Sequence, residues 1–297
     1  MTTIAIILWA ALALAAIFVY YVRYVEPHAF EVTRLELRFE DLPDALDGLT
    51  IAHLSDFHCQ PTGGSEATSA EAVRLVSEVA ADLVVITGDL LDGYDLLENS
   101  GWQLEGMSAS LGVWAVLGNH DHYCFYASGL GKSPEPPLNE IKSSLRGRGI
   151  EVLSNERRVI EVGGAKLALV GCDDAASGND DLAAAMVGAD ESDLVVLLAH
   201  SPDVFDDPEA PRADLILCGH THGGQLRLPG IGSPWAPVWR DRRRSAGLMR
   251  AGGPLCYVTR GVASATQARF MCRPEISVIT LRPGRTDGVR EVSVRRS

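Results

Sequence analysis

The sequence predicts an α/β fold, in which buried strands form a sheet that presents a ligand site at one edge. Several short runs of the chain are almost wholly apolar, as is typical of strands covered on both faces. Amphipathic helical patterns lie between some of these runs. Five of the runs lead into Asp, Asn or His, and sites in open α/β sheets lie beyond the carboxyl ends of strands. We therefore expect one sheet-based domain with a polar site.

The composition narrows the class of protein. The 297 residues carry a formal net charge of −13 and are 46% hydrophobic, which suffices for one large domain with a real core. An acidic chain is a poor general nucleic-acid binder, because phosphate backbones need clustered Lys and Arg. The main basic run, Arg240 to Arg244, is either a solvated loop or a contact for an anionic substrate or headgroup. The six cysteines form no CxxC motif, so no zinc knuckle or redox motif is indicated.

The N-terminus begins with an uncharged apolar run from Ile4 to Val22. Such a run just spans a hydrocarbon core as a helix. A cleaved signal peptide is the alternative, but the usual positive n-region is missing. We expect an uncleaved anchor over residues 1–24, a linker and first strand over 25–48, and the main domain over 49–297. Because Arg23, Arg34 and Arg38 follow the run, a single-pass anchor in the inner (cytoplasmic) membrane is expected, with the catalytic domain facing the cytoplasm.

The first half of the chain contains four expected strands. Thr33 to Phe39 alternates apolar and polar residues like a half-buried strand. Leu49 to Ser55 is a second strand, and a helical pattern over Ala70 to Ala81 follows it. Leu83 to Thr87 and Val113 to Leu117 are short continuous apolar runs, which indicates strands buried on both faces.

The second half of the chain repeats this pattern. A Pro-rich connector, Ser133 to Pro137, leads into a helix expected over Leu138 to Arg146. The runs Val159 to Val162 and Lys166 to Val170 predict a hairpin through Gly163-Gly164. The remaining strands are expected at Leu194–Ala199, Leu215–Cys218, Leu255–Thr259 and Ile276–Leu281.

Polar residues at the strand ends form a candidate metal site. The set is Asp56, His58, Asp89, Asn119, His200, His220 and His222, with His120 beside them. Carboxylate, amide and imidazole ligands together suit divalent first-row metals. Seven ligands are too many for one tetrahedral ion but suit two ions that share a bridging carboxylate. Such a pair activates a water, so attack of a metal-bound hydroxide on a phosphoester is the predicted chemistry.

The same residues carry a family resemblance. The motifs Asp56-x-His58, Gly88-Asp89, Gly118-Asn119-His120-Asp121, His200 and Gly219-His220-Thr221-His222 resemble, in order and spacing, those of the calcineurin-like metallophosphoesterase superfamily. The resemblance runs from about Leu49 to Gln225. It implies a four-layer αββα sandwich of two mixed sheets flanked by helices, here preceded by one N-terminal transmembrane helix.

The resemblance also implies roles for individual residues. One metal would be held by Asp56, His58, Asp89 and His222. The other would be held by Asp89, Asn119, His200 and His220, with Asp89 as the bridge. His120 would bind the phosphoryl group or protonate the leaving oxygen, and Asp121 would orient or charge-stabilise its ring. The implied cofactors are two divalent transition metal ions, manganese, iron or zinc, with manganese favoured. Asp173 and Asp174 also follow a strand, but the resemblance does not require them.

The stretch from His222 to Pro229 resembles a narrower branch of membrane-anchored or exported bacterial phosphohydrolases. Some of these hydrolyse the pyrophosphate of UDP-2,3-diacylglucosamine. A phosphodiester or pyrophosphate, on a small phosphorylated molecule or a lipid-linked one, is therefore the expected substrate. Arg227, Arg242 and Arg243 are candidates to bind a second phosphate or a headgroup. The loop with Trp235 and Trp239 either packs in the core or rests on a membrane surface.

Other functions stay open at this point. The enzyme could be a broad phosphodiesterase or phosphatase that acts on small soluble substrates. A non-catalytic metal-binding scaffold is a second alternative, but every ligand position and His120 are filled. A nuclease is a third, disfavoured by the acidic charge and by the lack of interleaved aromatic and basic residues. No nucleic-acid partner is therefore expected.

Overall fold

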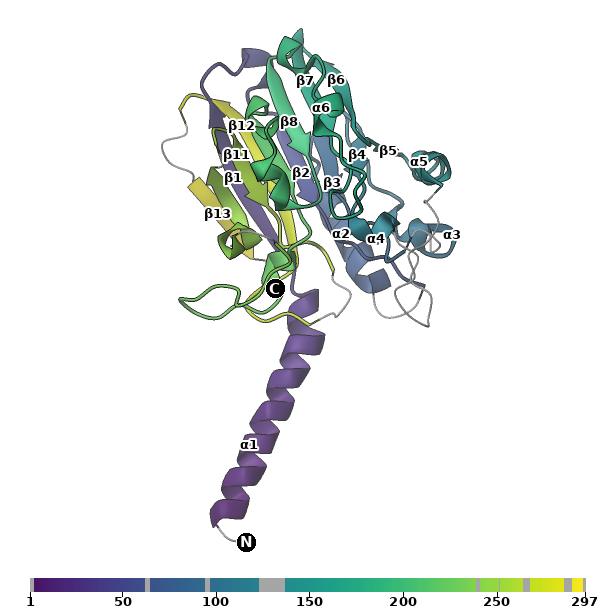
Figure 1. The fold of residues 1–297 in the computed structure, drawn as a ribbon. Helices are drawn as coiled ribbons and strands as arrows, with labels where there is room; N and C mark the ends of the chain where they lie inside the picture. The colour runs from purple at the N-terminus through teal and green to yellow at the C-terminus, as the bar shows by residue number, and fades with distance from the viewer. Residues whose placement is uncertain are drawn as a thin grey trace.

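Two β-sheets packed face to face form the body of the protein, and helices cover their outer faces (Figure 1). The computed structural model describes residues 3–61, 65–93, 97–122, 137–238, 241–250, 252–263, 268–285 and 290–295. The expected four-layer architecture of two mixed sheets with flanking helices is confirmed.

The first sheet has seven strands. In spatial order they are β13 (Arg290–Arg295), β1 (Glu31–Phe39), β12 (Glu275–Pro283), β2 (Thr50–Leu54), β3 (Leu83–Thr87), β4 (Val113–Val116) and β5 (Ile150–Val152). The strands from β2 to β5 are parallel to one another, whereas β12 runs antiparallel to β2. β1 pairs with both β12 and β13. The expected first strand is therefore an internal part of this sheet.

The second sheet has six strands. In spatial order they are β10 (Gly247–Arg250), β11 (Leu255–Val258), β9 (Leu215–Cys218), β8 (Leu194–Leu198), β7 (Ala165–Gly171) and β6 (Glu156–Val162). The four central strands are parallel, and both edge strands are antiparallel to their neighbours. β6 and β7 form the hairpin expected from the sequence.

The described residues form six α-helices, of which the first two are the longest. They are α1 (Thr3–Tyr20), α2 (Ser65–Val79), α3 (Leu97–Ser100), α4 (Asn119–His122), α5 (Leu138–Arg146) and α6 (Leu182–Ala185), and short 3-10 turns join them. α2 and α5 pack on the outer face of the first sheet, and α6 packs on the outer face of the second.

Side chains of the central strands alternate between two core layers, one between the sheets and one beneath the helices. In β3, Leu83 and Val85 face the space between the sheets, whereas Val84 and Ile86 face α2 and α5. β8 and β9 alternate in the same way toward the second sheet's own outer layer. Because successive side chains of a strand point to opposite faces, a strand inside two layers must be apolar at every position. This explains the continuous runs in the sequence.

Three strands were not expected from the sequence. β5 has three residues, β10 is partly exposed, and β13 forms an edge. Most of the Pro-rich connector lies outside the described residues.

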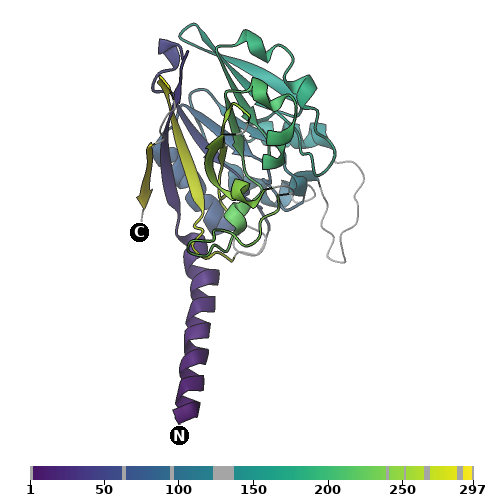
Figure 2. The same cartoon turned by 60° about the vertical axis from the view of Figure 1, so that its left-hand side comes forward.

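The N-terminal helix α1 leaves the domain at one end and points away from it (Figures 1 and 2). The helical segment Thr3–His28 is long and apolar enough to cross a membrane, and none of its most apolar part is buried against the domain. This finding agrees with membrane anchoring.

Candidate metal centre

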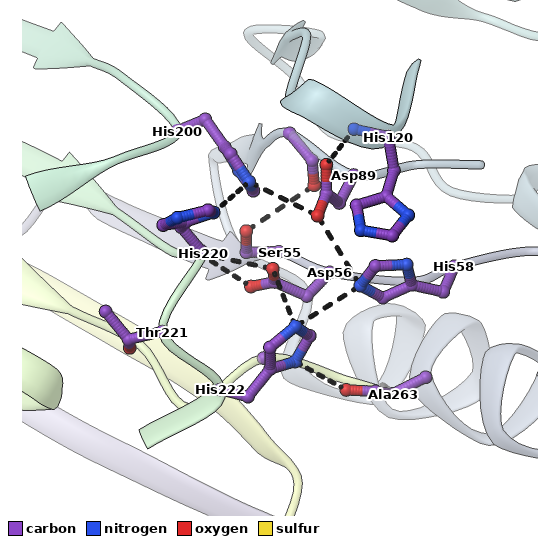
Figure 3. A network of polar contacts seen from close by, with 12 residues as sticks. Ser55, Asp56, His58, Asp89, His120, His200, His220, Thr221, His222 and Ala263 are labelled. Atoms are coloured by element: carbon purple, nitrogen blue, oxygen red, sulfur yellow. Dashed lines mark hydrogen bonds and ion pairs between the residues drawn. The ribbon is translucent and has the colours of Figure 1, made fainter. Parts of the chain in front are cut away.

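The carboxyl ends of five strands meet at one edge of the two sheets. β2, β3 and β4 lead into Asp56, Asp89 and Asn119 from the first sheet, while β8 and β9 lead into His200 and His220 from the second. Figure 3 shows the side chains of Asp56, Asp89, His200 and His220 pointing into one space, together with those of His58 and His222. The predicted strand-end residues are thus brought together.

The backbone around this space is unusually strained. Five of the seven candidate ligand residues have positive φ angles, namely Asp56 (59°), His58 (46°), Asp89 (50°), His220 (67°) and His222 (49°). Non-glycine residues rarely adopt this conformation, and where it clusters it marks functional sites. The strain lets each short loop turn its side chain back toward the sheet edge.

Close approach of the chain also requires glycine here. A Cβ atom on Gly118 would overlap the Asp89 carboxylate and backbone nitrogen, and one on Gly219 would overlap Ser55 and Asp56. Any side chain at these positions would displace a candidate ligand. This accounts for the glycine that precedes Asn119 and the one that precedes His220.

A first group of donor atoms comes from Asp56, His58, Asp89 and His222, all within 4.8 Å of one another. Nε2 of His222 lies 3.3 Å from Nε2 of His58 and 3.7 Å from Oδ1 of Asp56. The other ring nitrogen of His222, Nδ1, donates a hydrogen bond to the carbonyl of Ala263 at 3.0 Å. A carbonyl can only accept, so Nε2 of the neutral ring carries a lone pair toward the group.

A second group comes from Asp89, His200 and His220. Nδ1 of His200 donates to the carbonyl of Thr87 at 2.8 Å, and Nε2 lies 3.0 Å from Nδ1 of His220. Asp89 belongs to both groups, because its Oδ2 lies 3.5 Å from His58 Nε2 and 3.2 Å from His200 Nε2. Asp89 therefore stands between the two groups, where a bridging ligand would stand.

An orphaned polar atom tests whether a metal fits. Oδ1 of Asn119 is buried and has no hydrogen-bond partner in the described part of the chain. A buried acceptor without a partner costs free energy, about 1–3 kcal/mol. Coordination of a cation would satisfy it, so the donor set fits a metal.

The electrostatics also favour cations. Burial lowers the pKa of His220 to about 3, and burial together with His58 lowers that of His222 well below its ordinary value. Both rings are therefore neutral at physiological pH, as metal ligands must be. Burial alone would raise the pKa of Asp89, but His200 and His120 outweigh it and hold that pKa well below its ordinary value.

His200 responds to the same carboxylates. Burial alone would lower its pKa, but Asp89 and Asp56 outweigh burial and raise it to about 10. The pocket thus favours a positive charge at this point, and a divalent cation competes with the proton for it.

His120 lies beside the first group, and its partner differs from the expected one. Its Nδ1 donates to Oδ1 of Asp92 at 2.6 Å, while its backbone N–H donates to Asp89. Asp121 was expected to orient or charge-stabilise the ring. Its carboxylate instead accepts hydrogen bonds from the backbone N–H groups of Gly118, Leu90 and Leu91. The expectation for Asp121 is thus corrected: a buried carboxylate is drawn to the unpaired amides of the adjacent loop, and it holds that loop rather than the ring.

Sequence reasoning missed two residues that support the site. Asp92 follows Asp89 by three residues, and its acidic side chain in a strand-end loop was the available signal. Arg269 is fully buried and donates to the carbonyl of Ala263, the group that also accepts from His222. No local pattern in the sequence marks Arg269, because its partners are backbone carbonyls.

The predicted arginines are placed as follows. Arg227 donates to the carbonyl of Gly223, next to His222. Arg243 is almost fully exposed and pairs with Asp241. The side chain of Arg242 lies outside the described part. Asp173, which was left out of the predicted site, forms a buried pair with His122 at 2.7 Å.

Comparisons with known proteins agree with the fold. Residues 49–224 match the model of the family described as "Calcineurin-like phosphoesterase". Phosphodiesterase YaeI of Escherichia coli is 34% identical over 88% of this chain and 92% of its own. The uncharacterized metallophosphoesterase YkuE of Bacillus subtilis is 30% identical, over 88% of this chain and 89% of its own. UDP-2,3-diacylglucosamine pyrophosphatase LpxG of Chlamydia muridarum is 23% identical over 86% and 90%.

The fold and these relatives define a class, the metal-dependent hydrolases of phosphoric esters or diphosphates. Within that class, the chain belongs to the calcineurin-like phosphoesterase family.

Proposed function

We propose that the protein is a membrane-anchored phosphohydrolase that uses two divalent transition metal ions to cleave a phosphodiester or a pyrophosphate. The position of Asp89 carries this proposal, because its carboxylate faces imidazole nitrogens of both donor groups at 3.5 Å and 3.2 Å. Asp56, His58 and His222 would hold one ion, and Asn119, His200 and His220 the other. Manganese is the favoured metal, with iron and zinc as alternatives.

When bound, two such ions would supply a water of lowered pKa and neutralise the oxygens of the phosphoryl group. The protein's own contribution is to fix the ligands. The carbonyls of Thr87 and Ala263 hold the rings of His200 and His222, so that one nitrogen of each faces the site. Asp121 holds the backbone that follows Asp89, at Leu90, and the backbone that precedes Asn119, at Gly118. These contacts keep the donors in place before substrate arrives.

His120 is proposed as the residue that contacts the phosphoryl group or protonates the leaving oxygen. Burial alone would lower its pKa, but Asp89 and Asp92 outweigh burial and raise it. A ring held by Asp92 through Nδ1 presents Nε2 as the proton donor.

The proposal is tested with full-length protein in detergent, with Mn²⁺ and bis-p-nitrophenyl phosphate. We expect Asp89→Asn to lower kcat/KM by at least about a hundredfold, because a bridging charge is lost. Asp44→Asn, which changes an exposed carboxylate, is the matched control and should retain activity. Wild-type protein that hydrolyses neither diesters nor pyrophosphates with any of the three metals would refute the proposal.

A narrower proposal concerns the substrate. The apolar helix and the relative named as a UDP-2,3-diacylglucosamine pyrophosphatase support a lipid-linked substrate. Turnover of UDP-2,3-diacylglucosamine well above that of simple diesters is the expected result. Equal or poorer turnover would favour the alternative, a broad phosphodiesterase or phosphatase for small soluble substrates.

The orientation is also a proposal. Arg23, Arg34 and Arg38 follow the apolar run and support a domain on the cytoplasmic side of the inner membrane. Protease added to intact spheroplasts should then leave the domain uncut. Cleavage of the domain from outside would contradict this orientation.

A further inference from the structure

Exposed apolar side chains gather at the end of the domain where α1 leaves it. Apart from the N-terminal segment, the large exposed hydrophobic residues of the described chain are Trp102, Val187, Leu226, Leu228, Ile231, Trp235 and Met271. The last five belong to two segments that are paired with each other, and we call them the apolar rim. Such clustering is unusual on a soluble surface and marks an interaction site.

Backbone contacts join the two segments of the apolar rim. The N–H of Phe270 donates to the carbonyl of Gln225, and the N–H of Arg227 donates to the carbonyl of Phe270. Leu228 and Gly232 exchange two hydrogen bonds, which closes a tight hairpin with Ile231 near its tip. The rim is therefore a defined structure that begins four residues after the candidate ligand His222.

The same segments are attached to the anchor. The ring of Phe270 packs against that of Phe18 in α1, with 5.0 Å between centroids. The N–H of Arg269 donates to the carbonyl of Val22, and the N–H of Cys272 donates to the carboxylate of Glu26 at 2.6 Å. These contacts leave little freedom for the domain to turn on its anchor.

The contact with Phe18 also sets a depth. Phe18 lies within the apolar run that would fill the hydrocarbon core, four residues before its end at Val22. Phe270 and its neighbour Leu226 therefore lie near the boundary between acyl chains and headgroups. The loop after β9 is drawn beside the upper end of α1 in both views (Figures 1 and 2).

The charge of these segments fits a lipid surface. In a chain of net charge −13, residues 223–238 and 268–274 contain no Asp or Glu. Arg227 and Arg273 lie within them, and cations are attracted to anionic headgroups. A tryptophan at the rim is also typical of membrane interfaces.

We propose that the apolar rim inserts into the interface of the bilayer that holds α1, so that the loop bearing His222 lies against the lipid surface. The occupant of this surface is the lipid bilayer, because the rim is continuous with the anchor and lies at the depth of its last turns. This inference does not depend on turnover. Together with the proposed hydrolase function, insertion of the rim means that substrates reach the site along the membrane.

The test measures the depth of single spin labels in full-length protein in phosphatidylcholine–phosphatidylglycerol nanodiscs. The labels are placed by Ile231→Cys on the rim and by Val187→Cys, a matched control just after α6, in a Cys124→Ser background. The two native side chains are 72% and 67% exposed, and the five cysteines of the described residues are buried. Power-saturation EPR compares access of the label to oxygen, which enters lipid, with access to a water-soluble nickel complex.

We expect the ratio of oxygen to nickel access at position 231 to exceed that at position 187 by roughly tenfold, as for insertion to the acyl boundary. Leu228→Cys repeats the measurement if Ile231→Cys fails to fold. Equal, nickel-dominated access at the rim and at position 187 would overturn the proposal. A rim label shielded from both reagents would also overturn it, because a protein partner or a second copy would then cover the rim.

Discussion

Replacing the buried Arg269 with leucine would remove the contact that supports the loop behind His222. The guanidinium donates to the carbonyls of Arg260, Gly261, Ala263 and Cys272. The carbonyl of Ala263 also accepts from Nδ1 of His222. Arg269→Leu should therefore loosen both the loop and one candidate metal ligand.

The size of the effect follows from these contacts. Each buried carbonyl left without a donor costs about 1–3 kcal/mol. The desolvation of the guanidinium, several kcal/mol in the native protein, is removed at the same time and offsets part of this. We expect a net loss of about 2–4 kcal/mol in the free energy of unfolding. Loss of support for His222, a proposed metal ligand, should weaken Mn²⁺ binding about 10–100-fold.

Urea unfolding and calorimetric Mn²⁺ titration of the full-length protein measure both quantities. Arg282→Leu, which removes a partly exposed arginine paired with Asp47, is the control and should change neither by much. If the leucine variant does not fold, Arg269→Lys replaces it in the test and should retain part of the stability and part of the Mn²⁺ affinity. Wild-type stability and Mn²⁺ affinity in Arg269→Leu would refute the role assigned to this residue.

Three further predictions rest on separate contacts. Asp92→Asn should lower kcat, measured at saturating Mn²⁺, about a hundredfold, because Asp92 holds the His120 ring; an unchanged kcat would contradict this. Burial alone would raise the pKa of Glu275, but Arg260 and Thr33 outweigh it and lower that pKa below its ordinary value. The stabilisation by the Glu275 carboxylate is therefore present above about pH 4.5 and is lost as the pH falls through the folded-state pKa. Urea unfolding of Glu275→Gln should show a loss of about 3 kcal/mol at pH 7 that shrinks toward pH 3, whereas a constant difference would argue against the ionised form. Addition of Mn²⁺ at a hundred times its Kd to chelator-treated protein should raise the free energy of unfolding by about 2.7 kcal/mol for each ion bound, and thermal melting that is insensitive to metal would argue against the donor groups.

The central strands could be predicted because they are marked locally, whereas their arrangement in two layered sheets was implied by the family resemblance. Leu83–Thr87 and Leu194–Leu198 are apolar at every position since both of their faces are buried. β10 carries no such mark because its residues are partly exposed, and β13 is an edge strand that is placed by its pairing with β1. Their place in the sheets depends on their neighbours, which single-sequence patterns do not reveal.

The candidate ligands were found for a similar reason, since each follows a strand closely in the sequence. The groups that hold them were not found. Asp92 reaches His120 across 28 residues, and Arg269 reaches the carbonyl behind His222 from a distant segment. The role of Asp121 was implied by the family resemblance, which pairs it with His120, whereas the backbone turns its carboxylate toward Leu90 and Leu91. Long-range contacts of this kind need the folded chain.

The central claim is that Asp89 joins two metal ions in one site. Its most direct test is the EPR spectrum of the full-length protein titrated with Mn²⁺, in the wild type and in Asp89→Asn. The account predicts two bound ions per chain with a spin-coupled spectrum in the wild type. It predicts uncoupled or weakly bound Mn²⁺ in the variant. A single uncoupled ion per wild-type chain, or a coupled pair that survives Asp89→Asn unchanged, would contradict the account.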